Sequence, residues 1–469
     1  MTAAAEFATW SSLLLVALSS SGIALYINNV QKTPYMDEVF HVPQVQQYCS
    51  GNFSSWDPMI TTLPGTYLAS VGVLYPISMV TQQLLVDMCT TSILRGINIL
   101  FTTANCYLLL CIYTTLHPQV TPWRAAAIAT TLTVFPVMYF FTFLYYTDPG
   151  SIFFVLMMYY FHLQGYKLLA AMMGVVAIVF RQTNIIWVVF VAGLSTQTCI
   201  MDWMKMEKKP LKSHDGNDLR ILKRFISLVW ANLRKPSLIL ELLLNILIST
   251  FWYICVGAGF LSFIRLNDGI VVGDKSHHQA CLNFPQIFYF LSVALVFAAP
   301  HMISVPKILN FIKFSIKNFI LVLAFCSMSF ILIYKFTYVH KYLLADNRHY
   351  VFYVWSKIFR RHEYVKFALI PVYYYAAWQV HECLKHKNVF WKCVYLICLL
   401  ACTVPQKLME FRYFIIPYLI LRLNMIHESL VHTVLEFILY ALINSGTIYI
   451  FGEKTFTWEN SSDVQRFMW

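Results

Sequence analysis

The sequence predicts an all-α protein that crosses a membrane many times. Of its 469 residues, 59% are hydrophobic and only 12% carry a charge, whereas a soluble domain carries about 25% charged residues. Apolar stretches recur along the whole chain, and many of them reach the roughly 20 residues that a transmembrane helix needs. We therefore expect a single integral membrane domain over residues 1–469, with about 12 to 14 transmembrane helices.

The expected transmembrane segments follow one another from the start of the chain to its end. The first, 8–27, is as long as a full span and is preceded by Glu6 rather than by a basic region, so we interpret it as a retained helix and not as a signal peptide. The segment 168–198 is too long for one straight helix and is interrupted by a polar run at 181–184. The other expected segments are 63–84, 93–115, 125–143, 150–166, 238–264, 285–305, 318–336, 364–380, 390–404, 413–424 and 430–451.

The distribution of Lys and Arg predicts the orientation in the membrane. The largest polar segment, 201–236, is rich in both residues, and the positive-inside rule places such a loop in the cytoplasm. An even number of expected spans precedes it, so the N-terminus is expected in the cytoplasm as well. The first loop, 28–62, then lies on the opposite side, which for an internal membrane is the lumen, together with 265–284 and 337–350.

Several classes of function and site are excluded or disfavoured. The net charge of +12 does not indicate a nucleic-acid partner, because the basic residues mostly lie in loops where membrane topology requires them. The 12 cysteines are scattered and mostly lie in apolar stretches, so we expect packing residues rather than a disulfide framework or a metal site. The sequence has no DxD, HExxH or Gly-rich phosphate-binding motif, which argues against a site that depends on a metal or a nucleotide.

An adjacent acidic pair, Asp37 and Glu38, follows the first span. Residues 36–48 have the periodicity of an amphipathic helix at the membrane interface, with Asp37 and His41 on one polar face. A carboxylate in this place can act as a general base, and a neighbouring histidine can orient it. The alternative is that the acidic pair only stabilises the start of a surface helix through the helix dipole.

The stretch 56–65 is a second candidate, because two prolines and a glycine prevent it from forming a continuous helix. Its hydroxyl groups, on Thr61 and Thr62, and its backbone amides can contact a phosphate or a sugar. A rigid turn that leads back into the second span is an equally good interpretation.

Two further polar runs stand beside expected spans. In the run 345–350, the planar donor fork of Arg348 suits a phosphate, which favours a binding site over a simple interfacial anchor. In the second run, Glu410 and Arg412 stand at a span boundary, where a local ion pair is the alternative.

Two charged residues, Asp148 and Arg181, fall within or beside apolar segments. Charges in such places usually line cavities or pair with each other, so these two are candidate partners. Together with Glu410 they leave open an alternative function as a membrane transporter or an ion-channel regulator. No inverted repeat, which many transporters contain, is visible in the sequence.

The polar runs together resemble a known family. PYMDEVFHVPQ at 34–44, WDPMITTLPG at 56–65, ADNRHY at 345–350 and EFRYF at 410–414 resemble the eukaryotic dolichyl-phosphate-glucose α-1,2-glucosyltransferases, and the likeness extends over essentially the whole chain. The resemblance implies a GT-C glycosyltransferase fold whose first lumenal loop carries interfacial helices and the catalytic residues. It also implies a multi-pass protein of the endoplasmic reticulum membrane with its active site facing the lumen.

The resemblance further implies the reaction and its residues. Glucose passes from dolichyl-phosphate-glucose to Glc2Man9GlcNAc2-PP-dolichol, the lipid-linked precursor of protein N-glycosylation, without a cofactor or metal. An α product from a β-linked donor requires inversion, for which one general base suffices; Asp37 matches the family's base, with Glu38 as the nearest substitute. Arg348, with His349 or Arg412, is expected to stabilise the departing dolichyl phosphate. The residues expected to bind substrates are His41, Trp56, Asp57, Thr61, Thr62, Asp346, Asn347, Arg348, His349, Glu410 and Arg412.

Overall fold

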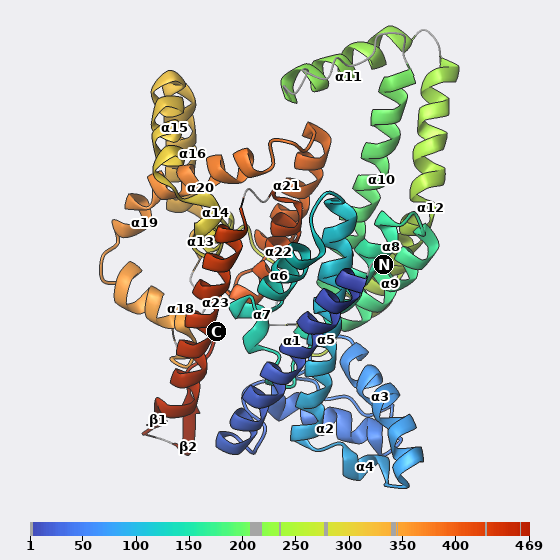
Figure 1. Cartoon of the computed structure of the whole chain (residues 1–469), viewed down its shortest axis with the longest axis vertical. Helices are drawn as coiled ribbons and strands as arrows, with labels where there is room; N and C mark the ends of the chain where they lie inside the picture. Colours follow the sequence, from blue (N-terminus) through green and yellow to red (C-terminus); the bar gives the residue numbers. More distant parts are fainter. Residues whose placement is uncertain are drawn as a thin grey trace.

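The computed structural model describes residues 3–206, 218–233, 236–275, 280–338, 344, 346–426, 429–459 and 461–469. It confirms the class of the protein as an all-α, multi-pass membrane protein (Figure 1). Within the described residues, six helices are long and apolar enough to cross a membrane. They are α1 (Ala3–Val30), α5 (Thr91–Leu116), α10 (Ile185–Met206) together with the preceding turn η1 (Gln182–Asn184), α12 (Pro236–Asn267), α16 (Phe319–Phe336) and α23 (Leu430–Glu453).

Four shorter apolar helices accompany these six in the described part of the chain. They are α3 (Gly65–Thr81), α9 (Lys167–Phe180), α13 (Pro285–Phe297) and α21 (Val389–Thr403). The expected total of 12 to 14 spans stays a prediction, since length and apolarity alone do not decide which short or broken helices cross the membrane. The remaining helices are α2 (Glu38–Cys49), α4 (Leu85–Met88), α6 (Pro122–Thr133), α7 (Pro136–Phe140), α8 (Asp148–Leu163), α11 (Asp218–Asn232), α14 (Ala299–Met302), α15 (Val305–Lys317), α18 (Tyr350–Tyr353), the π-helical turn Val354–Phe359, α19 (Val365–Ala368), α20 (Ile370–Cys383), η3 (Phe411–Phe414) and α22 (Ile415–Asn424).

Several expected spans are broken helices. The expected span 125–143 is divided into two helices, α6 and α7, and the first residue of α7 is Pro136. A proline at this position lacks the N–H that would continue the preceding helix. The predicted interruption at 181–184 is confirmed, because α9 ends at Phe180 and α10 begins at Ile185. Breaks of this kind place irregular backbone at membrane depth, which is tolerated where it is buried in protein or lines a cavity.

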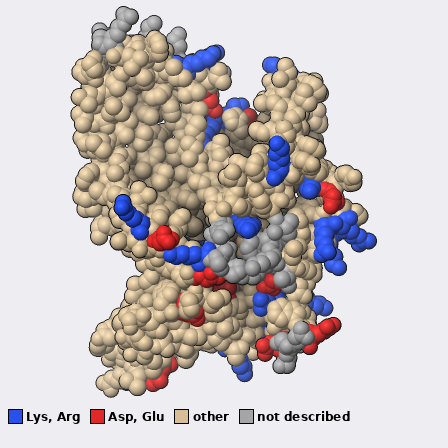
Figure 2. Space-filling model, turned by 180° about the vertical axis from the view of Figure 1, so that it is seen from behind, with Lys and Arg blue, Asp and Glu red and all other residues tan. Residues whose placement is uncertain are grey.

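The two ends of the molecule differ in their elements. Figure 1 places α2, α4 and a hairpin of β1 (Thr455–Trp458) and β2 (Ser461–Arg466) at one end, and α11 and α15 at the other. The segment 201–236, expected as a basic loop, contains α11, while 207–217 and 234–235 lie outside the described residues. Figure 2 shows a large lobe at upper left that is almost free of charged side chains. Charged side chains gather in the notch beside this lobe, around the middle of the molecule and on its right side.

The expectation of packing cysteines rather than a disulfide framework is wrong for one pair of cysteines. Cys49, the last residue of α2, is bonded to Cys89, which follows α4. Both belong to a small buried cluster beneath α2 that also contains Val42 and Val45. Because the two cysteines are 40 residues apart in sequence, no local motif announces the pair. The bond ties α2 to the segment that follows α3.

Candidate functional site

A cavity of about 470 Å³ lies at the end of the molecule that carries α2 and the β1–β2 hairpin. The structure brings together many of the residues predicted from separate parts of the sequence. Those that line the cavity are Asp37, His41, Thr61, Thr62, Asp346, Arg348, His349, Glu410 and Arg412. Those that do not line it are Glu38, Trp56, Asp57 and Asn347.

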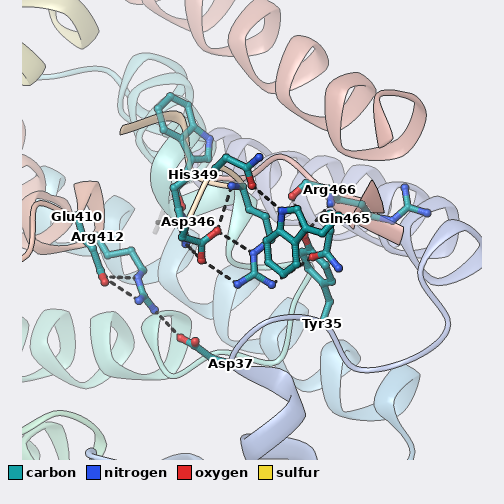
Figure 3. A network of polar contacts seen from close by, with 12 residues as sticks. Tyr35, Asp37, Asp346, His349, Glu410, Arg412, Gln465 and Arg466 are labelled. Atoms are coloured by element: carbon teal, nitrogen blue, oxygen red, sulfur yellow. Dashed lines mark hydrogen bonds and ion pairs between the residues drawn. The ribbon is translucent and has the colours of Figure 1, made fainter. Parts of the chain in front are cut away.

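Asp37 immediately precedes α2 and faces the cavity. Its side chain is 43% exposed, and its Oδ2 lies 3.5 Å from Nη1 of Arg412 (Figure 3). Its backbone N–H donates a hydrogen bond to the hydroxyl of Tyr146. The residue before it, Met36, has a φ of 55°, a conformation that is uncommon for any residue other than glycine and that often marks functional sites. The carboxylate is thus held at the cavity wall by a sharply turned backbone.

Glu38 has the opposite environment, although it is the next residue. It is fully buried, and its carboxylate accepts hydrogen bonds from Nε and Nη2 of Arg95 at 2.8 and 2.6 Å. The backbone N–H groups of Tyr35 and Tyr145 also donate to it. Four donors occupy this carboxylate, so its place is structural: it joins the start of α2 to α5 and to the turn before α8, and thereby positions Asp37.

Arg412 is the centre of a charged cluster on the cavity wall. Its guanidinium lies 2.8 Å from Glu410, 3.5 Å from Asp37 and 3.7 Å from Asp148. Burial acts to lower the pKa of Arg412, but the three carboxylates outweigh this effect and hold that pKa well above its ordinary value. The local ion pair between Glu410 and Arg412, which the sequence offered as an alternative to a site, is present, and both residues also line the cavity.

Asp148 and Arg181 form an ion pair, as their positions in the sequence indicated. Asp148 is the first residue of α8 and is almost completely buried, while Arg181 stands at the break between α9 and η1 and lines the cavity. Oδ2 of Asp148 has no hydrogen-bond partner among the described residues and faces Arg412 instead. The sequence signal was a charge beside an apolar segment, but it did not reveal that the pair joins the site.

Asp346 and Arg348 form a two-point ion pair on the other wall. Nε and Nη2 of Arg348 each lie 2.8 Å from a carboxylate oxygen of Asp346, and Nη1 lies 3.3 Å from Oε1 of Gln465 (Figure 3). The guanidinium carbon lies 4.8 Å from the ring centre of Trp458. Burial acts to raise the pKa of Asp346, but hydrogen bonds and charge from Arg348 outweigh it, so that this pKa is lowered.

The C-terminal segment forms part of the cavity, which sequence reasoning missed. Met468 and Trp469 line the cavity, and Nδ1 of His349 lies 2.8 Å from the carbonyl oxygen of Trp469. The indole N–H of Trp458 donates to Oδ1 of Asn347 at 2.9 Å, so Asn347 contacts the hairpin rather than the cavity. The only motif noted in the run 455–469, the sequon at 460–462, does not point to a cavity, and only the packing of the run reveals its place.

Arg466 fastens this hairpin to the first loop. Its guanidinium donates to the carbonyl oxygens of Val30, Phe451 and Gly452 and to Oε1 of Gln31, at 2.7 to 3.0 Å. The backbone of Arg466 also exchanges hydrogen bonds with the hydroxyl of Tyr35 (Figure 3). The hairpin is thereby joined to the ends of α1 and α23.

The stretch 56–65 divides into a structural half and a cavity half. The indole of Trp56 donates to the carbonyl of Ile60, and Asp57 accepts from the N–H of Met59, so both side chains stabilise the turn, as the structural alternative predicted. Thr61 and Thr62 line the cavity, and the hydroxyl of Thr62 is buried without a hydrogen-bond partner among the described residues. The segment after α12 packs on this turn and adds Asp274, which was not predicted.

His41 lies between the cavity and the interior. Its Nδ1 is 2.6 Å from the hydroxyl of Tyr67. Burial lowers the pKa of His41, against the raising effect of Asp37, so the ring is neutral near pH 7. The next polar residues on this side of α2, Gln44 and Tyr48, are buried, so the polar face is open only near the start of the helix.

Side chains on the cavity wall can accept a proton and can bind an anion. Asp37 is an exposed proton acceptor, and Arg348 and Arg412 present planar donor groups suited to a phosphate. In the described part of the chain, no group of three or more His, Cys, Asp or Glu residues is placed to hold a metal ion.

Comparison with known proteins assigns the family. The family model of the DIE2/ALG10 family matches residues 31–423, a range that includes Asp37, Arg348 and Arg412. A Rattus norvegicus protein named Dol-P-Glc:Glc(2)Man(9)GlcNAc(2)-PP-Dol alpha-1,2-glucosyltransferase is 45% identical over 450 residues, 93% of this chain and 94% of the relative. Relatives with the same name are 44% identical in Homo sapiens (93% of both chains) and 35% in Arabidopsis thaliana (95% of this chain and 97% of the relative). No solved structure matches the chain. The chain belongs to the DIE2/ALG10 family.

Proposed function

We propose that the protein transfers glucose from Dol-P-Glc to Glc2Man9GlcNAc2-PP-Dol and forms the terminal α-1,2 linkage. The relatives are named for this activity, and their similarity to this chain extends over nearly its whole length. The observation that carries the proposal is the convergence of Asp37, Arg348 and Arg412, from three distant parts of the sequence, on one cavity. Nothing in the relatives' names supports the transporter or channel-regulator alternative.

In the proposed reaction, Asp37 takes the proton from the 2-hydroxyl of the acceptor's terminal glucose. The resulting oxygen forms a bond to the anomeric carbon of the donor from the face opposite the phosphate. The bond from that carbon to the phosphate oxygen breaks, and its electron pair leaves with dolichyl phosphate. A single displacement inverts the configuration, as an α product from a β donor requires. The open side chain of Asp37, compared with the occupied one of Glu38, supports this choice of base.

Arg348 and Arg412 stabilise the charge of the departing phosphate in this proposal. Their guanidinium groups are held by Asp346 and Glu410, respectively, and both line the cavity. Donors that are fixed in advance stabilise a developing charge more effectively than donors that must reorganise. His349, Thr61 and Thr62 complete the polar wall on which the sugars lie. Trp56, Asp57 and Asn347 support the wall from behind.

We place the protein in the endoplasmic reticulum membrane, with a GT-C architecture and this cavity on the lumenal side. The Cys49–Cys89 disulfide lies at the same end as the cavity, and disulfides persist in oxidising compartments such as this lumen. The helices α11 and α15, which carry Arg220, Lys223 and Lys307 among other basic residues, lie at the other end, where the positive-inside rule places basic segments.

The test is glucose transfer from synthetic dolichyl-phosphate-glucose to a purified diglucosylated lipid-linked acceptor, with a chelator present. Asp37→Asn should lower kcat by about 10²- to 10⁴-fold, the usual contribution of a general base. Asp87→Asn is the matched control, because Asp87 is an exposed carboxylate of α4, beyond the cavity lining; it should retain activity. A folded Asp37→Asn protein with nearly full activity would disprove the base assignment. Failure of the wild type on a verified acceptor when the chelator is omitted would disprove the proposed function, and loss of transfer only when the chelator is present would disprove the expected independence of a metal.

A further inference from the structure

The loop that follows α2 carries an Asn-X-Ser sequence, Asn52-Phe53-Ser54, that the proposed reaction does not use. Such a sequence is the acceptor motif for an N-linked glycan when X is not proline. Because so short a motif also occurs by chance, the presentation of its asparagine decides its value. The chain has a second motif of this kind at 460–462, but Asn460 lies outside the described residues.

A defined turn ends α2 directly before the motif. Gly51 has a φ of 85°, the left-handed conformation that commonly ends a helix. Its N–H donates to the carbonyl of Tyr48, and the N–H of Asn52 donates to the carbonyl of Gln47 at 2.9 Å. These are the two hydrogen bonds of a Schellman motif. They satisfy two of the last carbonyl groups of α2 and fix the backbone that carries Asn52.

The two side chains that define the motif are exposed and contact each other. Asn52 and Ser54 are both exposed, and the hydroxyl of Ser54 donates to Oδ1 of Asn52 at 3.0 Å. Nδ2 of Asn52 donates to Oε1 of Gln47 at 3.2 Å, and an amide nitrogen has a second N–H. The ring of Phe53, between them, lies 5.1 Å from the ring of Tyr48. The middle residue thus rests on α2 while the amide and the hydroxyl stand at the surface.

The surface around the motif is polar. Gln46, Gln47 and Ser50, at the end of α2, are exposed, whereas the apolar side chains of Val45 and Tyr48 are buried. A surface within the hydrocarbon of a membrane would not expose amide and hydroxyl groups, because their transfer out of water is costly. The motif is therefore accessible from the aqueous side.

The motif lies at the end of the molecule that we place in the lumen. Figure 1 shows α2 and α4 at this end, and Cys49, which shortly precedes the motif, is bonded to Cys89. The helix α2 has 12 residues and is therefore about 18 Å long. Asp37 precedes this helix and Asn52 follows it, so a glycan on Asn52 lies at the opposite end of α2 from the proposed base.

We propose that Asn52 is an acceptor of an N-linked glycan. In this modification, Nδ2 of Asn52 forms a bond to the anomeric carbon of an oligosaccharide carried on a lipid diphosphate. The bond from that carbon to the diphosphate oxygen breaks, its electron pair leaves with the lipid diphosphate, and Nδ2 loses one proton. The proposal rests on the lumenal placement described above but not on the roles given to the cavity residues.

The experiment uses the full chain, with Asn460→Gln to remove the second motif, purified from eukaryotic cells that make N-linked glycans. Peptide N-glycosidase F removes such a glycan and leaves aspartate in place of the modified asparagine. We expect the enzyme to lower the mass of the protein, and peptide mass spectrometry to locate the new aspartate at position 52. Ser54→Ala should abolish the mass shift, whereas Ser54→Thr should retain it. The matched control is Ser50→Ala, which removes an exposed hydroxyl outside the motif and should also retain the shift.

An unmodified Asn52 overturns the proposal, and so does a mass shift that persists in Ser54→Ala. The variant Ser50→Asn/Asn52→Thr separates this failure from a wrong placement of the loop, because it moves the acceptor motif to residues 50–52 of the same exposed segment. A glycan on this variant beside an unmodified Asn52 would leave the lumenal placement intact. Absence of a glycan from both proteins would contradict that placement as well. Glucose transfer by the same preparations reports separately on the proposed reaction.

Discussion

Arginine–carboxylate pairs occur in two settings in this molecule. Buried pairs stabilise the fold, whereas partly exposed pairs stand on the wall of the cavity. Glu38–Arg95 and Glu436–Arg422 are completely buried, and each carboxylate is filled by donors. Asp37–Arg412 and Asp346–Arg348 stand on the wall of the cavity and remain partly exposed. The same two residue types thus hold helices together in one setting and present charge to a ligand in the other. The burial of the two side chains distinguishes the settings, since Asp346 also accepts three hydrogen bonds but remains partly exposed.

The largest expected effect comes from breaking a buried pair. Arg95→Met leaves the Glu38 carboxylate buried without its partner, which costs about 3–5 kcal/mol in the free energy of unfolding. Thermal melting of the detergent-purified protein measures the loss. Arg422→Met, at the other end, should cause a similar loss, because Glu436 is equally buried. A wild-type melting temperature in both variants would show that these pairs do not support the fold.

A smaller effect, on activity rather than stability, is expected on the cavity wall. Arg348→Met should lower kcat about 10²- to 10³-fold, the typical effect of removing one donor from a developing charge. Because Arg348 is partly exposed, the melting temperature should fall much less than in Arg95→Met. Transfer kinetics and melting of the same preparations test this contrast. A variant that loses stability without losing activity would reverse the roles assigned to the two settings.

The smallest expected effect is the pH dependence from His41, which stands between the two settings. Burial lowers its pKa in the folded state, whereas an unfolded histidine titrates near 6.5. Between these values the unfolded chain binds more protons, so stability falls as the pH drops below about 6.5, by at most about 1.4 kcal/mol per pH unit. Melting temperatures from pH 7.5 to 5.5 should show this fall, and it should be smaller in His41→Asn. An identical slope in both proteins would show that His41 is not its source.

The sequence allowed the class of the protein, the break at 181–184 and most of the charged side chains on the cavity wall to be predicted. Polar runs beside apolar spans are rare, so Asp37, Arg348 and Arg412 could each be identified as candidate site residues. The resemblance favoured Asp37 over Glu38, but the residues alone did not distinguish them, because the distinction depends on Arg95, which lies 57 residues away in the sequence. The C-terminal wall was missed for the same reason, since its residues gain a role only through contacts with 346–351 and with the first loop.

The side chain of Arg466 has a consequence for how α1 and α23 end. The last carbonyl groups of a helix lack partners within it and carry the negative end of its dipole. One guanidinium here caps two helices together, because it donates to Val30 at the end of α1 and to Phe451 and Gly452 at the end of α23. Two membrane helices far apart in the sequence therefore share one positive terminus cap. Their ends cannot separate without exposing both sets of carbonyls, so the frame around the cavity resists splaying at the membrane surface.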